Sequence, residues 1–465
     1  MSDLRITPTP IPGLLVVDLP LHGDTRGWFK ENWQRARMTA LGLPDFGPVQ
    51  NNMSFNASAG ATRGLHAEPW DKFVSLACGR IFGAWVDLRE GPSFGTSFTL
   101  EMGPDTAVFV PRGVANGYQA LEDGTVYTYL VNEHWSPEAR SSYTYLNLAD
   151  ESVAFAWPIP LDRAEISAAD AAHPRLAGVT PMPGRRTVIL GAGGQLGRAL
   201  TAVLPDAVPL ARSDLDTADP EALAAHDWTG VGAIIDAAAY TAVDRAETPE
   251  GRRDCWATNV AGVGNLVRLA RRIRATLVHV STDYVFDGSA EVHEEDEPFS
   301  PLGVYGQTKA AGDALVATLE QHYIVRTSWV IGDGRNFVRT MAELADRGVS
   351  PSVVDDQVGR LTFADDLAAG IVHLLAGGAP FGTYNLTNSG PSRSWAGIAR
   401  RVFELRGRDP GDIVPVSTAD YGASRVLAPR PAHSTLTLDR IAATGFTTTD
   451  ADERLRDYVA RLPRG

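Results

Sequence analysis

The chain has 465 residues and a formal net charge of −14, from 42 basic and 56 acidic side chains. One hydrophobic core rarely serves so many residues, so two or three domains are expected. A protein this acidic repels nucleic acid, so its overall charge excludes a non-specific nucleic-acid-binding protein. An anionic ligand must instead be bound by local clusters of Arg and Lys.

The two cysteines, Cys78 and Cys255, lie far apart in the sequence. We therefore expect neither a disulfide framework nor a metal site, and we interpret both thiols as buried small side chains. The first residues lack the pattern of a signal peptide, and no apolar run reaches the roughly 18–20 residues that span a bilayer. We expect a cytoplasmic protein that does not contact a membrane.

The first part of the chain is rich in short β-branched and aromatic runs broken by Gly, Pro and Asn. We predict strands within 14–19, 72–88, 106–111 and 125–131. Closely spaced runs of this kind are typical of an all-β sandwich or barrel, and no long amphipathic helix is expected here. The predicted first domain is 1–173.

Polar residues of this domain form a candidate site. His66 follows Arg63-Gly-Leu, Lys72 opens a strand and Tyr129 lies inside another. Further donors suited to a phosphate are Arg26, Gln50, Asn52 and Arg63. A lone His is more often structural than basic, and an alternating strand Tyr usually belongs to the core, so the residues alone leave both interpretations open.

Prolines, glycines and a lack of periodicity predict a linker at 174–185 and a second domain at 186–465. In that domain apolar runs at 187–191, 233–239 and 276–281 alternate with helical stretches such as 265–275. This rhythm predicts a doubly wound α/β sheet.

A glycine motif, Gly191-x-x-Gly194-x-x-Gly197, follows the first of these strands and opens a helix. Its setting predicts a dinucleotide site, because the glycines let the backbone approach a pyrophosphate at the positive end of the helix. Arg212 directly follows the next predicted strand, 207–211, where an Arg can bind the 2′-phosphate of NADPH. The alternative interpretation, a solvated surface Arg, has nearly equal weight. The cofactor-binding set we expect is Gly191, Gly194, Gln195, Leu196, Gly197, Arg212, Asp216, Ala237, Ala238, Tyr305 and Lys309.

Tyr305 and Lys309 stand four residues apart, which places both on one face of a helix. Reduction of a ketone needs a proton donor to the alkoxide, and a nearby ammonium lowers the pKa of a phenol enough to serve. Thr282 ends the strand before them, at the edge of the sheet where ligands bind. The three residues together predict a ketone reductase.

This part resembles dTDP-4-dehydrorhamnose reductase, an extended short-chain dehydrogenase/reductase of Rossmann type, over essentially all of 186–465. The matching stretches are GAGGQLG (191–197), AAAYTAVDRAE (237–247), STDYVFDG (281–288), VYGQTK (304–309), VRTSWV (325–330), DDQVGRLT (355–362), YNLTNSG (384–390) and PRPAHSTL (429–436). The resemblance implies that Thr282, Tyr305 and Lys309 are catalytic. It also implies a sugar-nucleotide pocket in the C-terminal part, formed by Asp283, Tyr284, Trp329 and Arg430. For Trp329 the alternative to binding the sugar is a place in the hydrophobic core. For Asn259 a structural role and a catalytic role have equal weight.

The first part resembles dTDP-4-dehydrorhamnose 3,5-epimerase, a cupin-like β-barrel without a metal, over about 11–172. The matching stretches are GDTRGWFKE (23–31), VQNN (49–52), RGLH (63–66), LACGRIFGAWVDLR (76–89), PSFG (92–95) and VPRGVANGY (110–118). The resemblance implies His66 as base, Asp170 as its orienting carboxylate, Tyr129 as acid and Lys72 as the group that stabilises the enolate. Arg26, Gln50, Asn52 and Arg63 then hold the nucleotide.

Three departures from the epimerase pattern lie near this implied site. Asn116 stands where that family has His, Gly83 where it commonly has Asp, and AEPWDK follows RGLH in place of an aromatic residue and Gln. They put the second epimerisation, at C5, in doubt. Two alternatives therefore stay open: a reductase whose β-domain is only a binding or assembly module, and a mono-epimerised dTDP-deoxysugar product.

The two resemblances together imply a bifunctional enzyme of dTDP-rhamnose biosynthesis. It epimerises a dTDP-4-dehydro-6-deoxysugar and then reduces its C4 ketone with NADPH, or alternatively NADH. They also imply a homodimer. Whether Mg²⁺ takes part is not decided by the sequence.

Overall fold

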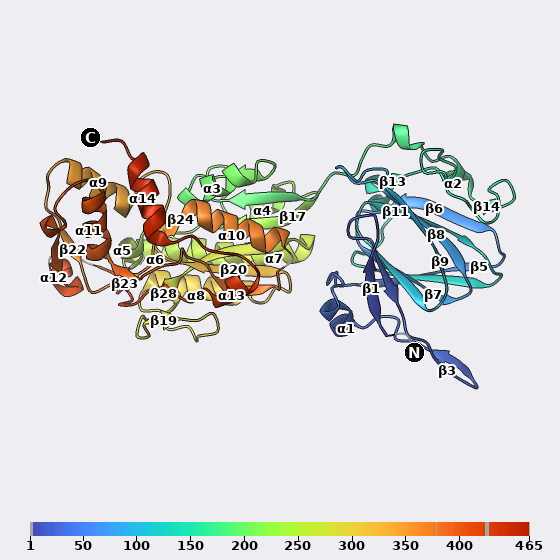
Figure 1. The fold of residues 1–465 in the computed structure, drawn as a ribbon, viewed down its shortest axis with the longest axis horizontal. Helices are drawn as coiled ribbons and strands as arrows, with labels where there is room; N and C mark the ends of the chain where they lie inside the picture. The colour runs from blue at the N-terminus through green and yellow to red at the C-terminus, as the bar shows by residue number, and fades with distance from the viewer. Residues whose placement is uncertain (1–2, 378, 424–426, 465) are drawn as a thin grey trace. The chain divides into compact units, whose positions relative to one another are not determined.

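The computed structural model describes residues 3–377, 379–423 and 427–464 (Figure 1). The chain divides into two compact units, Met1–Gly184 and Arg185–Gly465. The first is built mainly of strands and the second alternates strands with helices, so the predicted two-domain architecture is confirmed. No helix among the described residues is both long and apolar enough to cross a membrane.

The first unit holds two six-stranded sheets. One has the order β1 (Arg5–Pro8), β2 (Leu15–Asp18), β10 (Thr106–Val110), β7 (Lys72–Cys78), β12 (Thr125–Val131), β5 (Gln50–Asn56). The other has the order β13 (Thr144–Tyr145), β6 (Ala61–Ala67), β11 (Val114–Ala120), β8 (Ile81–Asp87), β9 (Ser97–Met102), with β14 (Glu165–Ile166) beside β6. Short helices α1 (Arg35–Ala40) and α2 (Ala168–Ala171) and a hairpin of β3 (His22–Asp24) and β4 (Gly27–Phe29) complete it.

Alternation along the strands divides the apolar side chains of this unit between several cores. On β7, Val74 and Leu76 enter the cluster between the two sheets, whereas Phe73 enters a cluster on the outer side of its sheet. On β8, Trp85 enters the same central cluster and Val86 faces the opposite way. Successive side chains of a strand point to opposite faces, so the sequence pattern itself produces this division.

Two parts of the first unit differ from the expected picture. The stretch expected as a linker packs on the first unit at three positions, because Met182 is buried there, Leu176 and Val179 are partly buried, and Glu90 N–H donates to the Met182 carbonyl at 2.9 Å. Cys78 is exposed, whereas we predicted a buried thiol. It is the last residue of β7, and the register between β12 and β7 shifts beside it, which places it beyond the core.

The second unit is organised around a parallel sheet of order β16 (Val208–Leu210), β15 (Arg186–Leu190), β17 (Val231–Asp236), β18 (Thr276–Thr282), β20 (His322–Thr327), β25 (Gly382–Asn385). Its helices are α3 (Gln195–Val203), α4 (Pro220–Ala225), α5 (Val243–Ala246), α6 (Pro249–Trp256), α7 (Val263–Ile273), α8 (Val304–Val316), α9 (Phe337–Asp346), α10 (Ala364–Ala376), α11 (Trp395–Leu405), α12 (Thr418–Gly422), α13 (Asp439–Ala443) and α14 (Ala451–Arg461). Short strand pairs are β19 (Val292–His293) with β28 (Thr435–Leu436), β21 (Val330–Ile331) with β24 (Thr362–Phe363), β22 (Ser352–Val354) with β27 (Val414–Val416) and β23 (Val358–Gly359) with β26 (Arg393–Ser394).

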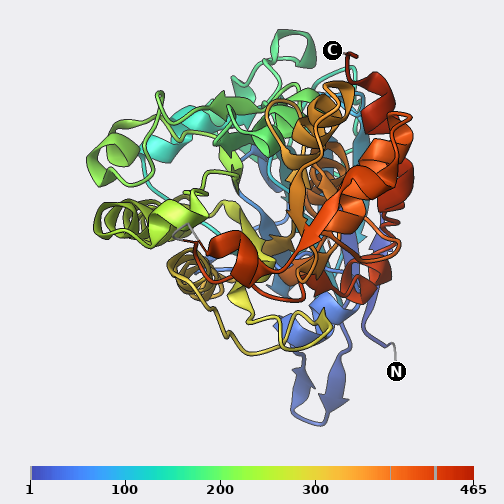
Figure 2. The same cartoon turned by 90° about the vertical axis from the view of Figure 1, so that its left-hand side faces the viewer.

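Helices cover both faces of this sheet (Figures 1 and 2). Ile234 of β17 and Leu277 of β18 pack with α4 and α7, whereas their neighbours Ile235 and Val278 pack with α3 and α10. A strand buried on both sides is apolar at successive positions, which explains the continuous apolar runs in the sequence. Because the strands are parallel, their carboxyl ends all lie at the same edge of the sheet. Thr282 lies at this edge, at the end of β18.

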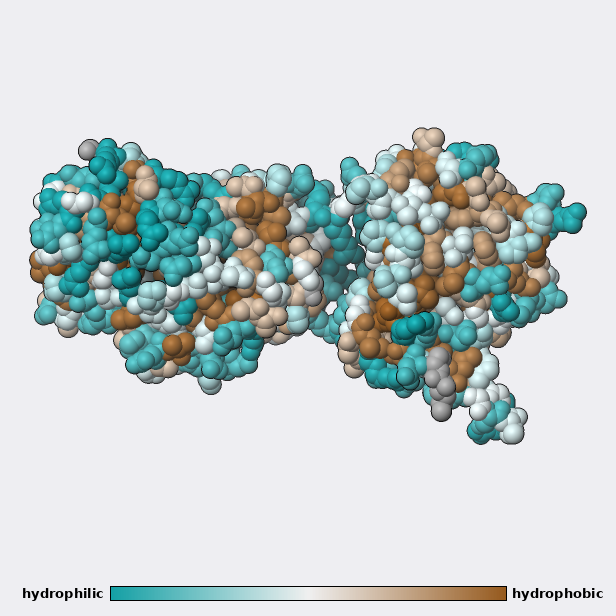
Figure 3. All heavy atoms as spheres, viewed as in Figure 1, coloured by the Kyte–Doolittle hydropathy of each residue, from teal (hydrophilic) through white to brown (hydrophobic). Residues whose placement is uncertain are grey.

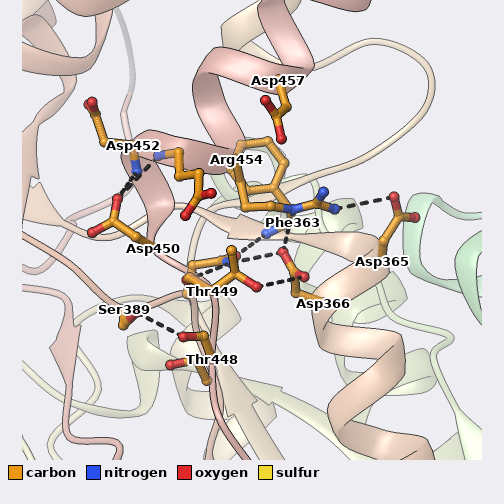
Figure 4. A network of polar contacts seen from close by, with 12 residues as sticks. Phe363, Asp365, Asp366, Ser389, Thr448, Thr449, Asp450, Asp452, Arg454 and Asp457 are labelled. Carbon is orange, nitrogen blue, oxygen red and sulfur yellow. Dashed lines mark hydrogen bonds and ion pairs between the residues drawn. The ribbon is translucent and has the colours of Figure 1, made fainter.

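The C-terminal helices form a further core around α9, α11 and α14. Arg454 of α14 extends over Phe363 to the carboxylates of α10, with its Nε 2.7 Å from Asp366 Oδ2 (Figure 4). Asp450 caps the helix by accepting from the N–H groups of the first turn. The face of the unit over these helices is mostly hydrophilic (Figure 3), as expected for a helix that buries only one stripe.

The glycine turn after β15 leaves no room for a side chain at Gly197. A Cβ on Gly197 would lie 2.2 Å from the Gly191 carbonyl oxygen, which is backbone and has no room to move. We expect Gly197→Ala to lower the free energy of unfolding of the second unit by about 1–3 kcal/mol, measured by urea denaturation of the full chain. Gly193→Ala is the matched control, because nothing lies within 4 Å of its added Cβ. Equal stability of the two variants would contradict this packing.

Candidate active sites

The first unit contains a cavity of about 940 Å³ whose lining comes from β5, β6, β11, β12 and the segment around α2. His66, Lys72, Tyr129, Asp170 and Arg63 all line it. These residues lie up to 107 positions apart in the sequence, and the pairing of β6 with β11 and of β12 with β5 brings them to one place.

His66 and Asp170 form a hydrogen-bonded pair in this cavity. The His66 Nε2 lies 2.8 Å from Asp170 Oδ1, and the Asp170 side chain is only 10% exposed. Burial raises the pKa of Asp170, but the hydrogen bond and charge of His66 outweigh it and hold the pKa below the usual value. An ionised carboxylate only accepts hydrogen bonds, so His66 carries its proton on Nε2 and keeps Nδ1 as the basic atom.

Lys72 is buried beside the cavity and held by two partners. Its ammonium forms an ion pair with Glu68 and donates to the Asn116 amide oxygen. The Asn116 amide N–H in turn donates to the Tyr127 hydroxyl at 3.0 Å. The ammonium is therefore fixed at a defined point of the cavity wall, where it can stabilise a negative charge on a bound molecule.

Tyr129 stands opposite Asn52 in the pairing of β12 with β5. Burial and then the charge of Glu68 raise the pKa of Tyr129 to about 12. The phenol therefore stays protonated at neutral pH and is available as a proton donor.

The second site lies at the carboxyl edge of the parallel sheet. Thr282 ends β18, and Tyr305 and Lys309 share one face of α8. Lys309 is 1% exposed, and its ammonium donates to the Val280 carbonyl at 2.7 Å and to His279 Nε2 at 3.1 Å. Burial and then the charge of Asp283 raise the pKa of Tyr305, which the sequence predicts to be lowered by Lys309. The phenolate is disfavoured because the surrounding protein replaces much of the water around the phenol and because the negative charge of Asp283 lies near it.

Asp283 and Tyr284 lie next to these residues. The Thr282 hydroxyl donates to Asp283 Oδ1 at 2.9 Å, and the rings of Tyr284 and Tyr305 meet edge to face. Arg430 pairs with Asp244 at 2.8 Å and also reaches Tyr284. Trp329 stacks on Trp395 with ring centroids 3.8 Å apart, so the core contact expected as its alternative role is present.

The turn after β15 provides room and polarity for a dinucleotide. Gly191 has a φ of +74°, and a Cβ there would lie 2.7 Å from the nitrogen of Ala238, two residues after β17. The first turn of α3 has no side-chain cap, which leaves its N–H groups facing outward for an anion such as a pyrophosphate. Arg212 is exposed after β16, with its guanidinium 3.5 Å from Asp216, and an Arg at this position can pair with a 2′-phosphate. These residues fit NADPH.

Comparisons with known proteins agree with this division. A family model described as the RmlD substrate binding domain matches residues 185–463, and one described as dTDP-4-dehydrorhamnose 3,5-epimerase matches residues 8–178. The chain belongs to the RmlD family and carries an RmlC-type domain ahead of it. The RmlC homolog of Streptococcus pyogenes is 48% identical over 177 residues, which cover 37% of this chain and 89% of that protein.

The RmlD-type domain is similar to known reductases over most of their length. The dTDP-4-dehydrorhamnose reductase of Mycolicibacterium smegmatis is 37% identical over 289 residues, which cover 60% of this chain and 86% of that protein. A solved dTDP-4-dehydrorhamnose reductase from Bacillus anthracis in complex with NADP is 33% identical, with a TM-score of 0.55, and covers 60% of this chain and 99% of that one.

Some expected residues lie outside the cavity of the RmlC-type domain. Arg26 is in the β3–β4 hairpin, exposed and paired with Asp24 at 2.5 Å. Gln50 and Asn52 are bonded to each other at 2.8 Å on β5, and neither they nor Arg26 belong to the lining. In the RmlD-type domain Gln195 is engaged within the protein, since its amide oxygen accepts from Gly332 N–H at 2.7 Å.

Several lining residues escaped the sequence interpretation. Glu68 stands two positions after His66, so strand alternation could have placed it on the same side. His173 follows Asp170 by three positions, and its Nε2 lies 3.9 Å from Asp170 Oδ1.

In the RmlD-type domain the side chain of Asn259 is bonded to the Tyr240 backbone at 2.8 Å and to Thr308 at 3.1 Å, which supports the structural interpretation of Asn259.

Asp283 gives a prediction on stability. Burial raises its pKa to about 6, so the folded state binds a proton that the unfolded state releases near pH 4. Stability of the second unit therefore falls as the pH rises from about 4 to about 6. We expect Asp283→Asn to abolish this fall and to raise the free energy of unfolding at pH 8 by about 1–3 kcal/mol, measured by urea denaturation.

Asp287→Asn is the control, because the pKa of Asp287 is lowered by its hydrogen bonds to Ser289 and no gain is expected. A pH profile that Asp283→Asn leaves unchanged would contradict the burial of an ionisable carboxyl at this position.

Proposed function

We propose that the chain is a bifunctional enzyme of dTDP-rhamnose biosynthesis. The RmlC-type domain, a cupin-like barrel, epimerises dTDP-4-dehydro-6-deoxyglucose at C3 and C5. The RmlD-type domain, a Rossmann-type reductase, then reduces the C4 ketone. The observation that supports the proposal is that each domain brings the expected side chains together. Four of them line one cavity of the first domain, His66, Lys72, Tyr129 and Asp170, and in the second Thr282 ends β18 beside Tyr305 of α8, which also carries Lys309.

In the barrel, His66 Nδ1 removes the proton from the carbon beside the ketone. Asp170 holds the imidazole in the required tautomer and stabilises the imidazolium that forms. The C4 oxygen gains charge as the enolate develops, and Lys72 stabilises it. Tyr129 returns a proton from the other face, which inverts the configuration. Arg63 binds the nucleotide from within the cavity, and Arg26, Gln50 and Asn52 do so from its surroundings.

The departures from the epimerase pattern are compatible with catalysis. Asn116 holds Lys72 where that family has a His, and Glu68 pairs with the same ammonium. An aspartate at position 83 has no place here, because a Cβ on Gly83 would already lie 2.4 Å from the buried Trp85 ring. The cation is thus supported in a different way while the His66–Asp170 pair is intact. This favours a working epimerase over a purely structural module.

In the reductase, NADPH supplies the hydride when bound, with NADH as the weaker alternative. Gly191, Gly194, Leu196, Gly197, Ala237 and Ala238 hold its diphosphate and nearby groups, and Arg212 with Asp216 meets the adenosine ribose. The Tyr305 hydroxyl gives its proton to the C4 oxygen. The Thr282 hydroxyl turns from Asp283 to donate to that oxygen, and Lys309 holds the nicotinamide ribose. Asp283, Tyr284, Trp329 and Arg430 bind the sugar nucleotide. We further propose a cytoplasmic homodimer.

Separate substitutions test the two-site assignment. Tyr305→Phe removes the proton donor and is expected to reduce ketosugar-dependent NADPH oxidation by at least about 100-fold, while solvent deuterium still exchanges into C3 and C5. His66→Ala is expected to abolish the exchange and to leave reduction of an already epimerised ketosugar intact. Both are measured on the full chain, by NMR and by absorbance at the nicotinamide band.

Tyr384→Phe is the control for the phenol, since its hydroxyl donates to the Pro380 carbonyl at 2.6 Å, away from the site. A folded variant that loses both activities would refute two independent sites. Absence of exchange in the unmodified protein would favour the reductase-only alternative, and exchange at one carbon alone would favour a mono-epimerised product.

A further inference from the structure

A closed cluster of charged and polar side chains lies behind Lys309 in the RmlD-type domain. It contains Asp236 at the end of β17, His279 on β18, Asp313 one turn after Lys309 on α8, and Arg326 on β20. Each of these residues is at most 3% exposed. With two carboxylates against one ammonium and one guanidinium, the cluster is neutral when His279 is neutral, which is the arrangement that a dry interior favours.

His279 has a defined tautomer in this cluster. Its Nδ1 lies 2.8 Å from Asp236 Oδ2, and a carboxylate can only accept, so Nδ1 carries the proton. Its Nε2 is then a lone-pair acceptor, 3.1 Å from Lys309 Nζ. Since the Val280 carbonyl accepts a second N–H of Lys309 at 2.7 Å, one N–H remains for the active site.

The packing of α8 makes this contact possible. A Cβ on Gly312 would lie 2.8 Å from the Asn259 carbonyl and 3.4 Å from His279 Nε2, so a glycine allows the close approach of the helix to β18. Asp313 pairs with Arg326 at 3.0 Å through Oδ2 and lies 3.8 Å from His279 Nε2 through Oδ1. The helix that carries Tyr305 and Lys309 is thus fixed to the sheet through His279 and Arg326.

We propose that His279 and Asp236 are positioning residues of the reductase: Asp236 sets the tautomer of His279, and His279 with the Val280 carbonyl fixes the Lys309 ammonium so that its remaining N–H points into the active site. This assignment rests on the proposed reductase function and adds to it the part of the machinery that holds the lysine. Neither residue touches the substrate in this account. Both act through Lys309.

The carboxylates of the cluster partly offset the effect of burial on Lys309. Burial lowers the pKa of Lys309 below its usual value, and the negative charges of Asp236 and then Asp313 oppose this lowering without cancelling it. Arg326 faces the cluster from β20 but is paired with Asp313. Removal of one carboxylate charge therefore lets Lys309 lose its proton at a lower pH.

The test compares three variants of the full chain with the epimerised ketosugar and NADPH. His279→Phe keeps the bulk but has no acceptor, and kcat is expected to fall at least about tenfold with KM changed less than about threefold. His279→Gln offers an amide oxygen to Lys309 and should restore most of the loss. His373→Phe is the control: its Nε2 lies 3.1 Å from the Thr444 carbonyl, outside the cluster.

A second measurement covers the case in which His279→Phe does not fold. Asp236→Asn retains an acceptor for Nδ1 but removes the charge, so the alkaline limb of the kcat profile is expected to move to lower pH by about one unit. Unchanged kcat in folded His279→Phe, equal losses in His279→Phe and His279→Gln, or an unmoved limb in Asp236→Asn would overturn the proposal. An unmodified protein without NADPH-dependent reduction would instead refute the proposed function itself.

Discussion

The burial of one ammonium group, that of Lys309, determines much of the arrangement of the second unit. A charge taken out of water is costly unless partners compensate for it, and here His279, the Val280 carbonyl and two carboxylates surround it. These partners come from β17, β18 and α8, so the parallel sheet must be complete before the lysine has its environment. The position of Tyr305 follows, because the same helix carries both residues.

The first unit also buries an ammonium group, with different partners around it. Lys72 is equally buried, but a single carboxylate, Glu68, neutralises it, and an amide, Asn116, completes its contacts. His66, which we propose as the base, has a carboxylate of its own, Asp170. Each domain thus holds a buried cation in the site where we propose that a neighbouring group transfers a proton. Both proposed reactions centre on the C4 ketone of one sugar, so two such sites on a single chain make chemical sense.

Much of this organisation could be predicted from the sequence because it depends on local patterns. Short β-branched and aromatic runs broken by Gly, Pro and Asn identified the β-rich part, the spacing of Gly191, Gly194 and Gly197 identified the turn, and a separation of four placed Tyr305 with Lys309. The partners of Lys309 could not be predicted, because His279 and Asp236 belong to strands 30 and 73 positions away and only the pairing of the sheet brings them near. The raised pKa of Tyr305 was missed for the same reason, since burial is a tertiary property.

The most direct test of the account supplies the full chain with dTDP-4-dehydro-6-deoxyglucose and NADPH in heavy water and identifies the product by NMR. The account predicts dTDP-rhamnose with deuterium at both C3 and C5 and one equivalent of NADPH consumed per sugar. A reduced sugar that retains the gluco configuration and carries no deuterium would contradict it, because the RmlC-type domain would then contribute no chemistry to the chain.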